Sequence, residues 1–312
     1  MAGSLVFAVL AVMSLRFGLG GTAELVGAGL PVLPVTLMIG AVQLALAGMA
    51  WGALLSRRLP AWLLVRARWV REAVNSILPV ASLGGSVVGA RLLAREGGVT
   101  GPEAGASAAA DVTGEAVAQF LFLLVALLLA STLPHAPFRP MAILAPVGAA
   151  LAALLVAQAL GAIGWLERLA IRYLPSRLAV ALTGIEDRLR AIYAAPWRMA
   201  GNIGWNFLSW SVGALEVVLL LTALGHPVPW RAAYAIEGLG ILARSLGFAL
   251  PAGIGAQETG FVLAGILFGV PREVALALSV LKRVREVISG IAGLGYWQWR
   301  EWRLTKIKRK QD

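Results

Sequence analysis

Long apolar stretches recur along the chain and constrain its fold more than any other feature. A helix needs about 20 apolar residues to cross a bilayer, and runs near this length lie at 4–20, 31–55, 104–131, 141–164, 201–224 and 274–297. Charged residues make up only 14% of the sequence, whereas a soluble domain carries roughly 25%. The sequence therefore predicts an all-α polytopic membrane protein with about six full crossings, and it argues against a soluble enzyme.

Two further apolar stretches, 61–94 and 231–270, are interrupted in the middle. Proline removes a backbone donor and glycine weakens a helix, so each stretch should split into two half-helices. Irregular backbone at membrane depth is stable only when it is buried in protein or lines a wet cavity. We therefore expect two re-entrant hairpins, whose backbone breaks fall at Pro79, Gly84, Gly85, Pro251, Gly253 and Gly255.

The basic residues predict the orientation. Nineteen of the 27 lysines and arginines follow the second crossing, close the first broken stretch, fill the connection 164–200 or crowd the C-terminus. The positive-inside rule assigns this side to the cytoplasm. Both termini are then cytoplasmic, in a bacterial inner membrane. The six crossings agree with this orientation only if each broken stretch enters the membrane and returns to the same side without crossing it.

The two hairpins would then enter from opposite sides, which predicts an inverted repeat within one integral membrane domain, 1–312. The first half, 1–163, contains the hairpin 61–94, and the second half, 201–299, contains the hairpin 231–270. The connection 164–200 has the pattern of amphipathic helices on the cytoplasmic leaflet, and 300–312 is expected to be a basic cytoplasmic tail. Interrupted helices at corresponding places in inverted halves indicate a transporter's midplane site. Chance recurrence of common Leu-Pro and Gly motifs is the alternative.

Polar side chains follow helical spacing on several of these segments. A capping box at 100–103, with Pro102 in the first turn, predicts a helix start there. Ionisable groups at membrane depth are expensive and usually mark function. The candidate substrate-binding residues are Arg71, Asn75, Arg91, Asp111, Glu115, Glu237, Arg244, Gln257, Glu258, Lys282, Arg283, Arg285 and Glu286.

The alternative is that these charges only form ion pairs that hold the bundle together. Lys282 and Glu286 have the i,i+4 spacing of such a pair. The single carboxylate of Glu286 cannot balance the three cations at 282, 283 and 285. Glu258 is therefore the expected second counter-charge, and Asp111 and Glu115 are the next candidates. Four polar faces together with two backbone breaks favour a water-accessible pocket over ion pairing alone.

Other chemistries have little support in the sequence. Cysteine is absent and only two histidines are present, so we expect no metal, no cofactor and no catalytic thiol. The glycines at 253 and 255 lack the Lys-Ser/Thr of a phosphate-binding loop. The net charge of +11 indicates membrane orientation and anionic headgroups, and no nucleic-acid partner is expected. The chain is predicted not to be an enzyme.

Two segments carry a resemblance to a known family. They are Asn75-Ser-Ile-Leu-Pro79 with Gly84-Gly85 and Arg91, and Leu250-Pro-Ala-Gly-Ile-Gly-Ala-Gln-Glu258 followed by Lys282-Arg283-Val-Arg285-Glu286. Together they resemble the flippase-like membrane domain of lysylphosphatidylglycerol synthases, most of all its stand-alone, hopanoid-biosynthesis-associated branch (HpnL). The resemblance implies transfer of a lipid between leaflets and, since the soluble aminoacyltransferase domain is absent here, no lysyl transfer.

The function expected from these observations is lipid transport. The cargo would be a hopanoid or an anionic phospholipid, moved across or out of the inner membrane. Hopanoid-synthesis or lipid-export proteins are possible partners. Two alternatives stay open at this point: a membrane-embedded enzyme that modifies a lipid headgroup, and a non-transporting scaffold for hopanoid synthesis.

Overall fold

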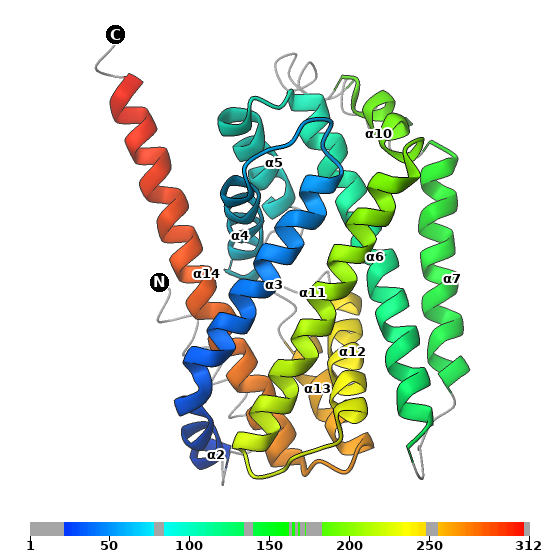
Figure 1. Ribbon diagram of the computed structural model, residues 1–312, viewed down its shortest axis with the longest axis vertical. Coiled ribbons are helices and arrows are strands. Elements are labelled where there is room, and N and C mark those ends of the chain that lie inside the picture. Colours follow the sequence, from blue (N-terminus) through cyan, green and yellow to red (C-terminus); the bar gives the residue numbers. More distant parts are fainter. Residues whose placement is uncertain are drawn as a thin grey trace.

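The protein folds as a bundle of helices that lie along one long axis (Figure 1). The computed structural model describes residues 22–77, 84–133, 140–161, 164–165, 168, 172, 183–247 and 255–308. These residues form helices and connecting turns, and no strand occurs among them. The all-α prediction is therefore confirmed for the described part of the chain. The predicted first crossing, 4–20, lies outside the described residues.

Four stretches are long and apolar enough to cross a membrane, namely Glu24–Ala53, Gly101–Ser131, Pro140–Ala159 and Pro196–Ala223. They match the crossings predicted at 31–55, 104–131, 141–164 and 201–224. Their helices are α2 (Thr22–Gly29), η1 (Leu30–Val32), α3 (Leu33–Ala53), α6 (Gly101–Ser131), α7 (Pro140–Ala159) and α11 (Pro196–Ala223). The last begins earlier than predicted, because Pro196 is suited to the first turn of a helix and starts it there.

The sixth predicted crossing, 274–297, lies within a longer helix, α14 (Arg272–Lys308). Its 37 residues correspond to about 55 Å at 1.5 Å per residue. Because charged residues lie in its middle, α14 is less apolar than the four spans named above. The helix extends into the segment 300–312, expected to be a basic tail, and continues as far as Lys308, through residues that include neither glycine nor proline.

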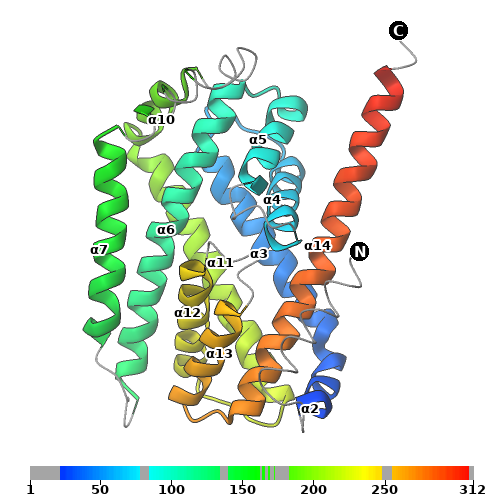
Figure 2. The ribbon, with the colours of Figure 1, turned by 180° about the vertical axis from the view of Figure 1, so that it is seen from behind.

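Each interrupted stretch forms two helices that pack against each other. These are α4 (Ala61–Ile77) with α5 (Gly84–Gly97), and α12 (Trp230–Leu246) with α13 (Ala256–Leu267). In Figures 1 and 2, α4 runs from the upper end to the middle of the bundle and α5 returns to the upper end. Helices α12 and α13 do the same from the lower end. The order crossing, hairpin, crossing therefore occurs twice in opposite directions, as α3 to α6 and as α11 to α14.

Local sequence explains several of these boundaries. The side chain of Thr100 accepts a hydrogen bond from the backbone N–H of Glu103 and caps α6 as predicted. The Glu103 carboxylate does not close the capping box; instead it accepts from the backbone N–H of Ser56 at 3.0 Å and so ties α6 to the end of α3. Helix α10 (Ile185–Tyr193) buries Leu189 and Ile192, and little else of the connection 164–200 is described.

The apolar core has an upper and a lower part. The upper part surrounds Trp51, Leu63 and Leu93 and joins α3 to the first hairpin. The lower part surrounds Phe261 and Leu278 and joins α11 and the second hairpin to α14. Helix α14 packs against both α4 and α13. It therefore connects the two hairpins, as does α6, which packs against α5 and α12. The charged clusters described next lie around these two helices.

Candidate functional site

Buried charged side chains form three clusters inside the bundle. The first cluster is Arg68, Arg71, Asp111 and Glu115; the second is Glu216, Glu237, Lys282 and Arg285; the third is Arg244, Glu258, Arg283 and Glu286. The second and third clusters each contain two basic and two acidic residues; the first has two of each and also pairs with Glu72, a partly exposed carboxylate that lies 3.0 Å from Arg68. A charge at mid-membrane costs at least about 2.5 kcal/mol on the insertion scale, and this balance of sign within each cluster offsets part of that cost.

The first cluster links the hairpin helix α4 to α6. The guanidinium of Arg68 lies 2.9 Å from Asp111 Oδ2 and 2.7 Å from Glu115 Oε1. Arg71 pairs with the same two carboxylates and lies 2.8 Å from Glu115 Oε2. Asn202 of α11 donates to the other oxygen of Asp111 at 2.7 Å. One charge-assisted network thus joins three helices.

The second cluster is centred on Lys282 of α14. Its ammonium donates to Glu216 Oε2 of α11 and to Glu237 Oε2 of α12, both at 2.9 Å. Arg285, about one turn along α14, lies 2.8 Å from the other oxygen of Glu216 and donates to Gln43 of α3 at 3.3 Å. This cluster therefore holds the second hairpin against helices of both halves.

The third cluster lies nearer the tip of the second hairpin. Arg283 Nε donates to Glu258 Oε1 of α13 at 2.9 Å, and its Nη1 donates to Glu286 Oε2 at 3.2 Å. The other oxygen of Glu286 accepts from Arg244 of α12 and from Gln257 of α13, both at 3.1 Å. Both helices of the hairpin are thus bonded to α14 at one place.

The first two clusters occupy corresponding places in the two halves, with the charges exchanged. Arg68 is the eighth residue of α4, and Glu237 is the eighth residue of α12. Their partners, Asp111 and Lys282, are each the eleventh residue of the following crossing helix, α6 or α14. In each half an ion pair therefore joins the same point of the first hairpin helix to the same point of the next crossing.

A band of partly exposed polar side chains lies near the ends of α4 and α12, at the middle of the bundle. This polar stripe comprises Glu72, Glu115, Gln119, Arg244 and Ser245. The side chains of Glu72 and Arg244 are 33% and 34% exposed. Gln119 donates to Ser245 at 2.9 Å, and Glu72 and Glu115 both pair with Arg68, at 3.0 Å and 2.7 Å. At the stripe, the charged interior reaches the surface of the protein.

The ion pair of Lys282 with Glu286, considered as the alternative to a pocket, does not form. Lys282 bonds to carboxylates of α11 and α12, while Glu286 bonds to Arg244 and Arg283. Residues four apart share a helix face, but here each side chain meets a partner of opposite charge on a neighbouring helix. The expected counter-charge Glu258 does pair with Arg283.

The expectation that Asp111 and Glu115 are further counter-charges for the cations at 282–285 is also wrong. Both carboxylates pair with Arg68 and Arg71 of the first hairpin. Arg68 is one of the basic residues that predict the orientation, and it is not among the candidate substrate-binding residues. The structure buries it, with a side-chain exposure of 5%.

Two predicted site residues lie apart from the clusters. Asn75 accepts a hydrogen bond from the backbone N–H of Gly85 at 3.0 Å and so links α4 to α5. Arg91 is exposed on α5 and lines a surface crevice together with residues of α14. Neither residue contributes to the three clusters.

The predicted backbone breaks are described only in part. Gly84 is the first residue of α5. Gly255 has a φ of +88°, a conformation that favours glycine, and its backbone N–H donates to Glu258 at 2.7 Å. Pro79, Pro251 and Gly253 lie outside the described residues.

Glu216 and Asn202 are functional candidates that the predicted site set omits. Both lie at helical spacing on one face of the 201–224 crossing, with Asn206, Ser209 and Gly213, and this spacing is the signal that could have included them. Glu216 is completely buried and joins the two basic residues of the second cluster. Among the described residues, no group of three or more His, Asp or Glu side chains has the arrangement of a metal site.

Comparison with known proteins gives one match. Residues 1–293 match the family model described as the lysylphosphatidylglycerol synthase TM region. No curated protein and no solved structure matches the chain. The family match extends over nearly the whole sequence and agrees with the four apolar spans. The chain is therefore a membrane protein that belongs to the lysylphosphatidylglycerol synthase transmembrane-region family, whose name relates it to lipid handling.

Proposed function

We propose that this protein moves an amphiphilic lipid across or out of the bacterial inner membrane. The cargo is a hopanoid or an anionic phospholipid, and the resemblance to the HpnL branch favours the hopanoid. The family match supports a role in lipid handling. Both termini face the cytoplasm in this proposal, which places the upper end of Figure 1 inside the cell.

The observation that carries the proposal is the opposed arrangement of the two hairpins. One enters the bundle from each end, and both end near its middle (Figures 1 and 2). In a membrane they are re-entrant, and the ends of α4 and α12 lie near the midplane. Interrupted helices in inverted halves build substrate sites at this depth in many transporters.

The polar stripe is the route for the lipid headgroup. A headgroup that crosses a bilayer needs polar contacts where hydrocarbon would exclude it, while the acyl or polycyclic tail can remain in the lipid. Arg244, Glu115 and Gln119 supply such contacts at the protein surface near the two tips. The neighbouring surface is apolar, since Leu121 and Leu246 are exposed.

The three buried clusters have a different role in this proposal. Apart from Glu115 and Arg244, which also belong to the stripe, their charges are paired inside the protein, so they position the hairpins and leave contact with the headgroup to the stripe. Helix α14 bonds to both helices of the second hairpin, and α6 bonds to the first. Movement of a hairpin would therefore require one balanced set of ion pairs to rearrange.

Leaflet-resolved lipid analysis of a deletion strain tests this function against its alternatives. Loss of a transporter leaves the lipid species present but changes its distribution between leaflets or membranes. Loss of an enzyme removes a modified species, and loss of a scaffold lowers the amount of lipid made without relocating it. A changed distribution at constant total amount supports transport; a missing species or a lower amount with normal distribution contradicts it.

A further inference from the structure

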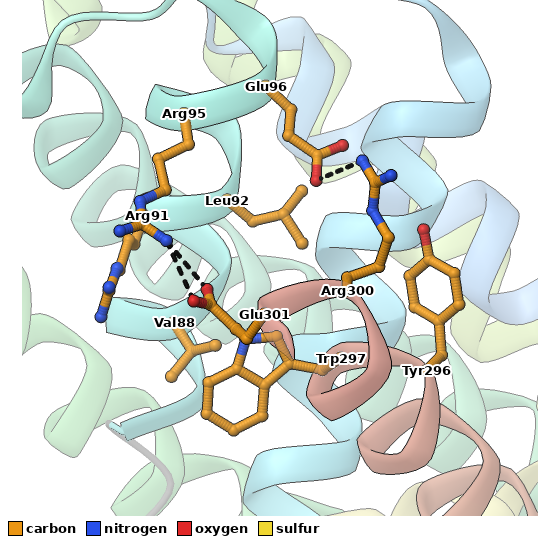
Figure 3. Close-up of a pocket in the computed structure, with 9 residues that line it drawn as sticks. All are labelled: Val88, Arg91, Leu92, Arg95, Glu96, Tyr296, Trp297, Arg300 and Glu301. Atoms are coloured by element: carbon orange, nitrogen blue, oxygen red, sulfur yellow. Dashed lines mark hydrogen bonds and ion pairs between the residues drawn. The ribbon is translucent and has the colours of Figure 1, made fainter. Parts of the chain in front are cut away.

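A crevice between α5 and α14 is separate from the three clusters and from the polar stripe. It is lined by Val88, Arg91, Leu92, Arg95 and Glu96 of α5, and by Tyr296, Trp297, Arg300 and Glu301 of α14. Figure 3 shows basic side chains on both walls, with Val88, Leu92 and Trp297 among them. The crevice is near the upper end of the bundle, where α5 ends.

Two ion pairs cross this crevice and involve two of its three arginines. Arg95 lies 3.0 Å from Glu301, and Arg300 lies 2.9 Å from Glu96 (Figure 3). The exposed side chain of Arg91 makes no hydrogen bond or ion pair with the part of the chain that the structure describes. Three basic groups against two carboxylates give the lining a positive excess.

Aromatic residues place the crevice at the depth of lipid headgroups. Trp62, Trp299 and Trp302 are about half exposed around this end of α4 and α14. Cations lie over two of their rings: Arg303 lies 4.2 Å from the Trp299 ring centroid, and Lys306 lies 4.3 Å from that of Trp302. Tryptophan and tyrosine concentrate at the membrane–water interface, with basic residues facing anionic headgroups.

We infer that this crevice binds the phosphate of an anionic phospholipid from the adjacent leaflet. Arg91 donates to the phosphate oxygens, since guanidinium groups bind phosphate in a bidentate manner. Arg95 and Arg300 reinforce the positive field, and the apolar surface of Val88 and Leu92 lies beside the start of the acyl chains. The site links α5 to α14 through a lipid, and it does not depend on whether the protein transports lipid.

Binding to the purified, full-length protein tests this inference. Native mass spectrometry of protein in detergent, titrated with phosphatidylglycerol, should show a saturable bound lipid. Arg91→Gln should weaken this binding about tenfold, the loss expected for a charge-assisted hydrogen bond. Arg58→Gln, at an exposed arginine just before α4, is the matched control and should leave the affinity unchanged.

Glu301→Gln provides a change in the opposite direction. It removes a carboxylate that competes with phosphate for Arg95, so phosphatidylglycerol should bind more tightly to this variant. If Glu301 only links the two helices, Glu301→Gln should not raise the affinity for phosphatidylglycerol. Unchanged thermal unfolding of each variant is the control for folding.

Soluble probes distinguish a lipid site from a general phosphate site. Inorganic phosphate should compete with phosphatidylglycerol only weakly, and diacylglycerol should bind equally to wild type and Arg91→Gln. Equal competition by inorganic phosphate at the lipid's own concentration would overturn the lipid assignment. If Arg58→Gln lowered the affinity for phosphatidylglycerol as much as Arg91→Gln does, the effect would come from net charge alone. That result would also overturn the lipid assignment.

Discussion

At the scale of single residues, pairing explains how so apolar a protein keeps its buried charges. Lys282 and Asp111 are almost fully buried, and each meets two groups of opposite charge. Removing one member of a buried pair leaves an uncompensated charge and costs about 3–5 kcal/mol, whereas replacing both members is often tolerated. Variants of the second cluster test this account.

Lys282→Met should destabilise the protein by about 3–5 kcal/mol, because two carboxylates then remain near Arg285 alone. Lys282→Met combined with Glu237→Gln should recover most of that loss, because the pair of Arg285 with Glu216 stays intact. Thermal unfolding in detergent measures both. Combining Lys282→Met with Glu286→Gln should give no recovery, since these side chains do not touch; recovery there would contradict the pairing described here.

The limits of sequence-based prediction are clearest for these residues. Helical spacing placed Asp111 with Glu115, and Lys282 with Glu286, on common faces. It could not show which neighbouring helix each face meets, because that depends on the rotation and depth of helices far apart in sequence. Arg68 pairs with Asp111 across 43 positions. The pair considered within one helix, Lys282–Glu286, does not form, whereas the counter-charge expected from another helix, Glu258, does pair with Arg283.

At the scale of elements, the hairpins depend on close contact between their two helices. Both interruptions were predictable, because proline and glycine disfavour helix at 78–85 and 250–255. The linkage within the first hairpin was not, because it uses the Asn75 side chain and the backbone N–H of Gly85. A Cβ at Gly85 would overlap the carbonyl oxygen of Arg71 and the side chain of Asn75.

Gly85→Ala should therefore separate α4 from α5 and destabilise the protein by about 1–3 kcal/mol, the usual cost of overpacking. Gly295→Ala is the matched control, because nothing lies within 4 Å of a Cβ at that position of α14. It should be neutral, or stabilising by up to about 1 kcal/mol. Similar unfolding temperatures for the two variants would show that the close approach at Gly85 does not hold the hairpin together.

At the scale of the whole molecule, the direction of the hairpins determines the topology. The chain has no cysteine, so a single introduced cysteine is the only thiol in the protein. Its labelling then shows which side of the membrane that position faces. His226→Cys is in the exposed turn between α11 and α12, and Arg58→Cys is in the connection between α3 and α4 at the other end. An impermeant maleimide added to intact cells should label the first and not the second. The reverse pattern would invert the proposed orientation.

If the stripe between the opposed hairpins carries the lipid headgroup, a change in its basic residue should slow lipid transport. Arg244→Gln removes the stripe's basic group, while Glu286 keeps its bonds to Arg283 and Gln257, so this variant should fold. Arg231→Gln, at the exposed start of the same helix, removes a hydrogen bond to Thr132 and is the matched control. Headgroup contacts through Arg244 predict a fall in transport of about tenfold.

The decisive measurement is the loss of leaflet asymmetry of fluorescent lipids in reconstituted vesicles. Vesicles with wild-type protein, loaded with a labelled phosphatidylglycerol or a labelled hopanoid, should expose inner-leaflet probe to external dithionite faster than empty vesicles. The rate should fall about tenfold with Arg244→Gln and stay unchanged with Arg231→Gln. Wild-type rates no higher than those of empty vesicles for both lipids would contradict transport.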